Sequence, residues 1–406
     1  MSEIAVPRGR RLSDAAQGRL SWTLWVAVVA LSALFAIVRY RAALADGAGV
    51  DLDAFAQAAR ALKAGHSPYD SELYVYSPLL AILLLPIADS PSLLRDWTVL
   101  SLIAVFVAIA AVVASVWPQL TRLQRPTVAL IAVVTMMYNT ETSIDLWFGQ
   151  SDFFLLAVTA LAVLAGIRRR PALSGTLLGF VAVLKTWPGG LLLWLLRAGA
   201  AGRHRAIGAA VVASAAVTAL LALVTGPGAM VEWVRRTLSS SSQEWTTFSV
   251  WGAGHHLFTN SGVMSPIVES RIGEMLTSGV LFAVVLALLV VVLRRPGDPR
   301  LAMWHVTACV ILVLPVSHSA YQLLVLPVLW VWAAIALGPS TRSREWWVPV
   351  GVLAVWWVLT FRLELTNDFS ASGSTVGYVL VMSVRLVALT VSVLFAARLP
   401  AVAPRP

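Results

Sequence analysis

The sequence predicts an all-α membrane protein with about ten to twelve transmembrane helices. Of its 406 residues, 59% are hydrophobic and only 12% are charged, and the mean hydropathy is +0.81. Long apolar runs recur along the whole chain, and an α-helix satisfies its own backbone hydrogen bonds inside lipid. The chain also lacks the segments of alternating polarity, roughly ten residues each, that indicate a transmembrane β-barrel.

The first predicted spanning helix covers residues 21–38, a run long enough to cross a hydrocarbon core of about 30 Å. Further apolar runs lie at residues 97–117, 127–139, 152–167, 173–196, 205–225, 276–293, 301–316, 319–337, 346–361 and 377–397. A shorter run covers residues 77–88. Either this short run or 127–139 must stop short of crossing, because otherwise the positive clusters before and after them would lie on opposite sides of the membrane.

The net charge of +10 comes largely from short clusters of arginine between the apolar runs. This is the pattern of cytoplasmic loops in membrane proteins, so it does not indicate nucleic-acid binding. The N-terminal segment 1–20 carries four arginines together with acidic residues and a proline. It is therefore interpreted as a cytoplasmic tail and not as a cleaved signal peptide.

These clusters predict one integral membrane domain over residues 1–406, with both termini in the cytoplasm. The tails cover residues 1–20 and 398–406, and the clusters at 168–170, 197–205, 294–300 and 342–344 lie on the same side. A first outer loop at 41–76 and a second at 226–275 then face outward, as do the turns 139–150 and 317–319 and the loop 362–376. The predicted location is the cell membrane, with the active site on its extracytoplasmic face.

The segment between Arg170 and Arg197 must enter the membrane and return, because both arginines are assigned to the cytoplasm. Pro188 and the two glycines that follow it favour a break around Lys185 to Gly190. Most of the unusual polar residues then gather near the outer membrane face, namely Asp51, Asp53, Asp145, Asp152, Lys185, His255, His256, His318, Glu364 and Asp368.

Four segments resemble, in order, the motifs of glycosyltransferase family 87. The string VDLDAFAQAARALKAGHSPYD (50–70), followed by YVYSPLLAILLLP (74–86), is similar to the family's first outer loop. FGQSDFFLLA (148–157) resembles a G-Q-x-N segment, VLKTWP (183–188) a K-x-x-P segment, and LPVSHSAYQLLVLP (314–327) a P-x-S-x-x-H segment. Asp152 departs from the usual Asn, Phe55 from Tyr, and Tyr321 lies near the usual His position.

The resemblance implies a GT-C fold and a sugar donor carried on a polyprenyl phosphate. It implies transfer of a hexose, with mannose as the first choice and arabinose left open, to a hydroxyl of a cell-envelope glycolipid or glycan. The protein is expected to contact membrane lipids. No cofactor is expected. The linkage, the oligomeric state and the pathway are not identified by the sequence.

Such a reaction needs a base, because a hydroxyl is a weak nucleophile until its proton is removed. Asp51, which aligns with the aspartate of the family's VDL motif, is the candidate for this role. The alternative is that Asp51 only caps the following helix, although Asp53 is better placed for the cap. One base suffices for inverting displacement, whereas a retaining route needs a second carboxylate about 5 Å away. Asp53 stays open for that second role.

The leaving phosphate needs cationic partners, and the candidates are Lys185, His318 and Arg60. A lysine at the tip of a membrane hairpin is costly unless it pairs with an anion. Pairing of Lys185 with Asp145 is the alternative. The other residues expected to contact substrate are Tyr69, Tyr76, Gln150, Asp152, Tyr321, His255 and Trp251. No metal site is expected, because His255 and His256 diverge on a helix and Cys309 is the one cysteine.

Two other classes of protein compete with the transferase. A transporter or lipid flippase would also place charges at membrane depth, but it predicts two related halves with matching broken helices. The sequence shows one convincing break. An O-antigen polymerase or ligase would carry its main outer loop late in the chain, whereas here the acidic loop comes first.

Overall fold

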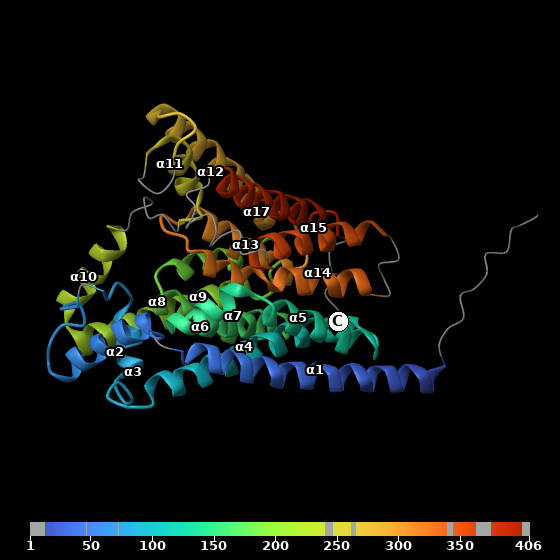
Figure 1. Cartoon of the computed structure of the whole chain (residues 1–406), viewed down its shortest axis with the longest axis horizontal. Helices are drawn as coiled ribbons and strands as arrows, with labels where there is room; N and C mark the ends of the chain where they lie inside the picture. The colour runs from blue at the N-terminus through green and yellow to red at the C-terminus, as the bar shows by residue number, and fades with distance from the viewer. Residues whose placement is uncertain are drawn as a thin grey trace, which may run out of the picture.

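The protein folds as an elongated bundle of packed α-helices (Figure 1). A computed structural model describes residues 13–45, 47–71, 73–239, 247–260, 265–338, 344–362 and 375–399. Helices make up 79% of the structure, and the described residues contain no β-strand. The predicted all-α class is confirmed.

In the described residues, six helical segments are long and apolar enough to cross a membrane. They are α1 (Asp14–Ala43), α4 with its extension η1 (Leu93–Gln119), α9 (Arg203–Thr225), α12 (Arg271–Arg294), η3 with α14 (Ser319–Leu337) and α17 (Thr375–Ala396). A seventh span arises if α6 (Thr140–Phe148) and α7 (Asp152–Ile167), bent by 114°, count as one. Uninterrupted spans are thus fewer than the ten to twelve predicted apolar segments.

The other apolar runs form shorter helices. They are α3 (Pro78–Leu84), α5 (Gln124–Met137), α8 (Pro171–Leu184), η2 (Trp187–Leu196), α13 (Pro299–Val313) and α15 (Trp347–Trp357) with the π-helical turn η5 (Val358–Arg362). With seven residues, α3 extends over only about 10 Å. The short run at 77–88 is therefore too short to cross a membrane as a helix. With 14 residues over about 21 Å, α5 is also shorter than the six long helices.

Burial separates inner helices from outer ones. Within the 18-residue apolar stretch of each helix, 83% of the residues are buried in η3 with α14 and 61% in α4. Only 11% are buried in α9 and 17% in α1. The largest fully buried side chains include Trp304, Trp330 and Trp332 on α13 and α14. Helices α13, α14 and α4 therefore form the core, and α1 and α9 present apolar surface outward as lipid-facing helices do.

Small residues allow α8 and α9 to approach closely. Gly175 and Gly179 lie one turn apart on α8, opposite Ala206 and Ala210 of α9, and a Cβ on either glycine would collide with the backbone of the alanine facing it. Such small-residue contacts replace the hydrophobic effect as a means of joining helices in lipid. They place the C-terminal end of α8, and with it Lys185, firmly in the bundle.

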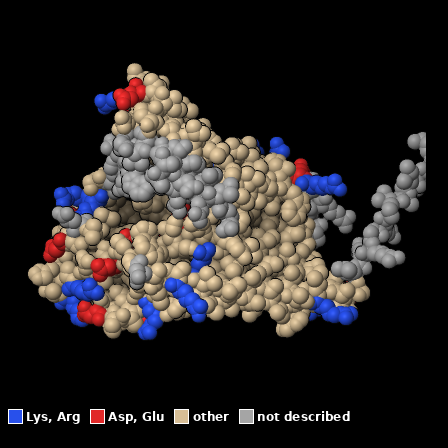
Figure 2. All heavy atoms as spheres, in the orientation of Figure 1, with Lys and Arg blue, Asp and Glu red and all other residues tan. Residues whose placement is uncertain are grey.

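Four short helices gather toward one end of the bundle, where α1 ends. They are α2 (Val50–Lys63), α3, α6 and α10 (Pro227–Leu238), with α11 (Val250–Phe258) above them in the view of Figure 1. On the face shown in Figure 2, charged side chains are most numerous toward the left end, a few basic ones lie near the middle, and much of the remaining surface is uncharged. This distribution fits a protein whose middle section lies in a membrane.

Some predicted boundaries shift. The tail predicted at 1–20 overlaps α1, which begins at Asp14 because the Ser13 side chain caps it. The loop predicted at 226–275 contains α10, α11 and the start of α12, and the turn predicted at 139–150 contains α6. The N-terminal arginines 8, 10 and 11, Trp245 and its serine-rich neighbours 240–244, Arg342, Glu364, Asp368 and tail residues 400–406 lie outside the described residues.

Candidate active site

Two glycines bring α2 against the turn between α6 and α7. Gly49 precedes α2 in a left-handed conformation, and its N–H donates to the Trp147 carbonyl at 2.6 Å. Gly149 ends α6 with φ +74°, and a Cβ there would lie 2.6 Å from the Cβ of Leu52. Because only glycine fits this conformation and this contact, Asp51 comes to lie beside Gln150.

Gln150 connects Asp51 to two other predicted residues. Its Nε2 donates to Asp51 Oδ2, and its Oε1 lies 3.4 Å from both the Tyr76 hydroxyl and Lys185 Nζ. Tyr76 packs edge-on against Phe55 of α2, with ring centroids 4.7 Å apart. Residues from the first outer loop, the α6–α7 turn and the end of α8 therefore meet at one point.

Lys185 lies at the predicted break. Helix α8 ends at Leu184, Lys185 has extended backbone angles, and η2 starts two residues later. Its ammonium forms a 2.5 Å ion pair with Asp152, and the two side chains are only 4% and 1% exposed. Asp152, and not Asp145, is thus the ion-pair partner of Lys185.

Aromatic rings surround the same ammonium. Lys185 Nζ lies 5.0 Å from the ring centroid of Tyr321 and 5.4 Å from that of Tyr76. The Tyr321 ring also packs against Trp187 and His318, each with centroids 5.5 Å apart. The late motif of the sequence therefore lies next to the Lys185 break, as the outer-face hypothesis requires.

Burial raises the pKa of the Asp51 carboxyl above its ordinary value. The positive charge of Lys185 opposes this rise, the negative charge of Asp152 adds to it, and the hydrogen bond from Gln150 favours the ionised form. Asp51 is thus partly buried, its pKa is shifted by its neighbours, and Gln150 connects it to the buried Lys185 ammonium. This combination is typical of functional sites.

Asp53 and Arg60 do not join this cluster. Asp53 accepts a hydrogen bond from Gln57 at 2.7 Å and lies 3.8 Å from Arg60. Arg60 donates twice to the Ala88 carbonyl and lies 3.4 Å from Asp89. Asp53 does not cap α2 either, because Gly49 is the N-cap and no side chain bonds there. The prediction that Asp53 is the better cap is wrong, since both aspartates lie within the first turn.

The two predicted substrate contacts on α11 also lie apart from Asp51. Trp251 donates its indole N–H to the Val313 carbonyl at 2.9 Å, and its ring packs on Phe282. His255 lies 3.4 Å from the Glu274 carboxylate of α12. Their recorded contacts serve the packing of α11, α12 and α13. No group of three or more His, Cys, Asp or Glu side chains suited to a metal ion occurs in the part of the chain that the structure describes.

Three further charged residues lie buried behind the cluster. Asp145 and Glu141 share a face of α6, and Asp145 interacts electrostatically with Asp152 and Lys185. Arg385, near the centre of α17, is 3% exposed, packs its guanidinium 4.6 Å from the Phe248 ring centroid and is attracted to Glu141. The sequence interpretation overlooked Arg385, although one arginine in the apolar run 377–397 is a signal of function or pairing.

The family model of glycosyltransferase family 87 matches residues 74–327, well over half of the chain. The chain belongs to glycosyltransferase family 87. Its membership makes it a membrane glycosyltransferase, and the resemblance seen in the motifs is confirmed. No curated protein sequence matches the chain significantly.

The family 87 match covers most of the cluster but not all of it. Tyr76, Gln150, Asp152, Lys185 and the late motif lie within residues 74–327, whereas α2 with Asp51 precedes them. The role of Asp51 therefore depends on its geometry. That geometry is specific, since Asp51 is bonded to a residue inside the matched region.

Proposed function

We propose that this family 87 enzyme transfers a hexose, with mannose as the first choice, from a polyprenyl-phosphate sugar to a hydroxyl of a cell-envelope glycolipid or glycan. The observation that carries the proposal is the chain of contacts from Asp51 through Gln150 to Lys185. It joins a carboxylate that can accept a proton to an ammonium that can bind a departing phosphate. These are the two functions that transfer from a sugar phosphate requires.

Asp51 is the general base in this proposal. The acceptor O–H donates its proton to the Asp51 carboxylate while its oxygen forms a bond to the anomeric carbon of the sugar. The bond between that carbon and the phosphate oxygen breaks, and its electron pair leaves with the phosphate. The hydrogen bond from Gln150 orients the carboxylate, so that it is positioned before the acceptor arrives.

Lys185 and His318 stabilise the departing phosphate. The Lys185 ammonium has three N–H donors, and among the described residues two of them bond, to Asp152 and to Gln150. In this proposal the third binds a phosphate oxygen. The Tyr321 ring lies against both the Lys185 ammonium and the His318 ring. A phosphate bound beside Tyr321 would therefore reach both residues.

The position of Asp53 supports inversion. Residues two apart on an α-helix are about 200° apart around its axis, so Asp51 and Asp53 point in nearly opposite directions. Asp53 is bound to Gln57 and Arg60, away from the Lys185 cluster. The retaining route that the sequence left open would need Asp53 as a nucleophile close to the sugar. We infer a single displacement with inverted anomeric configuration.

Contacts between positive segments support the predicted orientation. Ser21 near the start of α1 donates to the Arg122 carbonyl, Arg300 bonds Gln119, and Ala198 bonds Leu293 beside Arg294. The N-terminal part of α1 and these arginines thus share one end of the bundle, while the Asp51 cluster lies beyond the end of α1. By the positive-inside rule the arginine end is cytoplasmic, and the candidate site faces the extracytoplasmic side.

A transfer assay in reconstituted vesicles tests the function. We expect label from polyprenyl-phosphate mannose to appear in a new glycolipid with membrane extract as acceptor, and none from nucleotide-linked mannose. Polyprenyl-phosphate arabinose in a parallel arm decides between the two sugars. The new bond should have the anomeric configuration opposite to that of the donor. Movement of intact labelled donor across the bilayer without a new bond would instead assign the protein to transport.

The pH dependence of transfer should report Asp51. Because a base acts only when ionised, kcat/KM should fall at acid pH along a limb set by the raised pKa of Asp51. Replacing Gln150 with Leu removes a hydrogen bond to the ionised carboxylate, which raises that pKa further. The acid limb should therefore move to higher pH in Gln150→Leu. Profiles that coincide for wild type and variant would exclude Asp51 as the titrating base.

A further inference from the structure

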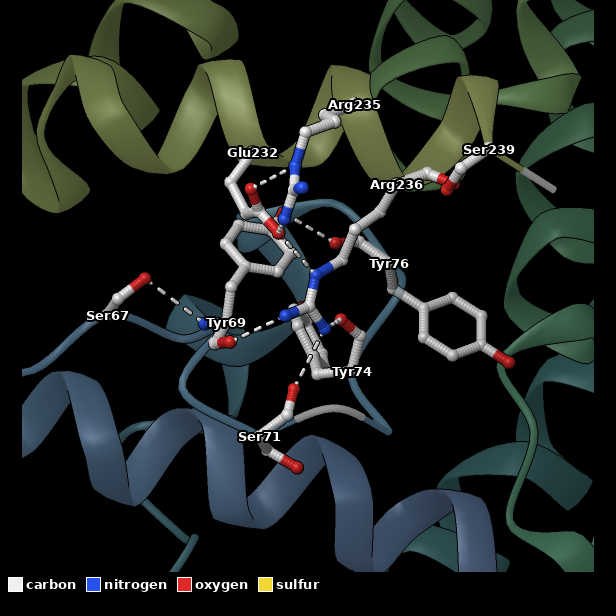
Figure 3. A network of polar contacts seen from close by, with 9 residues as sticks. All are labelled: Ser67, Tyr69, Ser71, Tyr74, Tyr76, Glu232, Arg235, Arg236 and Ser239. Carbon is white, nitrogen blue, oxygen red and sulfur yellow. Dashed lines mark hydrogen bonds and ion pairs between the residues drawn. The ribbon is translucent and has the colours of Figure 1, made fainter.

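Helix α10 lies against the outer loop that carries Tyr76. It follows α9 directly, and Arg236 near its end is only 18% exposed at its side chain. The guanidinium donates to three backbone carbonyls of the loop: Nη1 to those of Ser71 and Tyr74, both at 2.9 Å, and Nη2 to that of Tyr69 at 2.7 Å (Figure 3). One side chain thus fixes three points of a segment whose described residues form no helix.

Tyr69 passes this constraint to the candidate site. The Arg236 guanidinium lies 5.2 Å from its ring centroid. The Tyr69 hydroxyl in turn donates to the Tyr76 carbonyl at 2.7 Å, and the Tyr76 hydroxyl lies 3.4 Å from Gln150. A continuous series of contacts therefore runs from Arg236 to the residue that orients Asp51.

Glu232 holds the Arg236 side chain in place. It accepts from Arg236 Nε at 2.8 Å and from Arg235 twice, both at 2.7 Å. The hydrogen bonds from the two arginines lower the pKa of Glu232 to about 2, so the carboxylate is ionised at neutral pH. Arg235, by contrast, is 71% exposed, and within the described part of the chain its side chain bonds Glu232 and none of the loop carbonyls. The two neighbouring arginines therefore share a partner but differ in their contact with the loop.

The same helix also contacts the other half of the site. Trp233 donates its indole N–H to the Thr186 hydroxyl at 3.0 Å, and the Thr237 hydroxyl lies 3.2 Å from the same oxygen. Thr186 follows Lys185 directly in the chain. Helix α10 is thus joined to the side chain of Thr186, the residue after Lys185, on one side and to the loop of Tyr76 on the other.

We propose that α10 is a positioning element for the reaction, in which Arg236 sets the place of Tyr76 and Gln150 while Trp233 and Thr237 set the place of Lys185. The inference rests on the proposed function for its kinetic consequence. Inside the site, the loop and the Lys185 side meet through Gln150, which lies 3.4 Å from both the Tyr76 hydroxyl and Lys185 Nζ, and through the Lys185 ammonium 5.4 Å from the Tyr76 ring. A displacement of about 1 Å in a catalytic arrangement can cost about a hundredfold in rate.

Arg236→Ala and Arg235→Ala form a matched pair for testing the proposal. Arg236→Ala should lower kcat about tenfold or more and leave the donor KM close to wild type, because the loss is in orientation. Arg235→Ala should stay within about twofold. Arg236→Lys should not restore kcat, because one ammonium cannot reproduce the planar fork that binds three carbonyls. Restoration by lysine would mean that only the charge matters, and that would overturn the proposal.

The Lys185 side has its own variant. Trp233→Phe keeps the ring and removes the donor to Thr186, so it should raise the donor KM more than it lowers kcat if Lys185 binds the donor phosphate. Equal kinetics for Trp233→Phe and wild type would restrict the role of α10 to the loop and overturn the two-sided proposal.

A chemical probe separates this proposal from the proposed function. The one native cysteine, Cys309, is buried, so a Ser71→Cys protein should react with a maleimide mainly at residue 71. The labelling rate should rise about tenfold when Arg236→Ala is added and remain unchanged with Arg235→Ala. Equal rates in all three proteins would show that Arg236 does not hold the loop. This result stands whether or not the wild-type protein transfers sugar.

Discussion

Replacing Asp51 with Asn should lower the rate of sugar transfer by about 10² to 10⁴, the contribution typical of a general base. The amide keeps the size of the side chain and can still bond Gln150, but it cannot take a proton from the acceptor. Initial rates measured in vesicles with matched amounts of protein would give the effect. Donor binding should change little, because the cationic partners of the phosphate are untouched.

Two other aspartates serve as controls for this substitution. Asp53→Asn should retain transfer within a few-fold, since Asp53 bonds Gln57 and Arg60 and does not face the Lys185 cluster. Asp145→Asn removes a buried carboxylate that accepts no hydrogen bond from the described residues, and it should be tolerated as well. Equal loss from Asp51→Asn and Asp53→Asn would contradict the single-base account.

Lys185→Met should cost both stability and donor binding. Removing one partner of a buried ion pair leaves the other charge uncompensated, and the typical cost is about 3–5 kcal/mol of unfolding free energy. Asp152, which is 1% exposed, would be left in that position. We expect a clear fall in the thermal unfolding midpoint and a donor KM that rises more than kcat falls.

The double variant Lys185→Met with Asp152→Asn separates the two effects. Neutralising both partners should recover most of the lost stability, because the Asp152 charge that Lys185 balanced is removed as well. The donor KM should remain high if Lys185 binds the donor phosphate. A double variant with normal stability and a normal donor KM would reduce Lys185 to a structural residue.

Several features of the site could be predicted because they follow from local chemistry. The sequence Lys-Thr-Trp-Pro-Gly-Gly predicted a broken helix at residue 185, and the break is present. The spacing of Asp51 and Asp53 could also have been used to predict that one of the two aspartates lies outside the site. Side chains at positions i and i+2 of a helix point in nearly opposite directions. In the structure Asp51, and not Asp53, points toward Gln150.

Other features depended on packing that one sequence does not encode locally. The number of long spans falls because several of the predicted apolar runs form the shorter helices α5, α8, η2 and α13. The ion-pair partner of Lys185 could not be chosen from sequence, because Asp145 and Asp152 lie close to each other in the chain. The bend between α6 and α7 directs Asp152 toward Lys185. The Arg236 contacts join residues 162 to 167 positions apart, so no motif could reveal them.

A single-turnover experiment with bound donor tests the central claim most directly. Wild-type and Asp51→Asn proteins in vesicles are first loaded with labelled polyprenyl-phosphate mannose, and acceptor is then added. The account predicts equal loading of both proteins, followed by rapid formation of labelled product in the wild type and almost none in the variant. Product formation at the wild-type rate by Asp51→Asn would show that another group removes the proton, and the proposed role of Asp51 would be wrong.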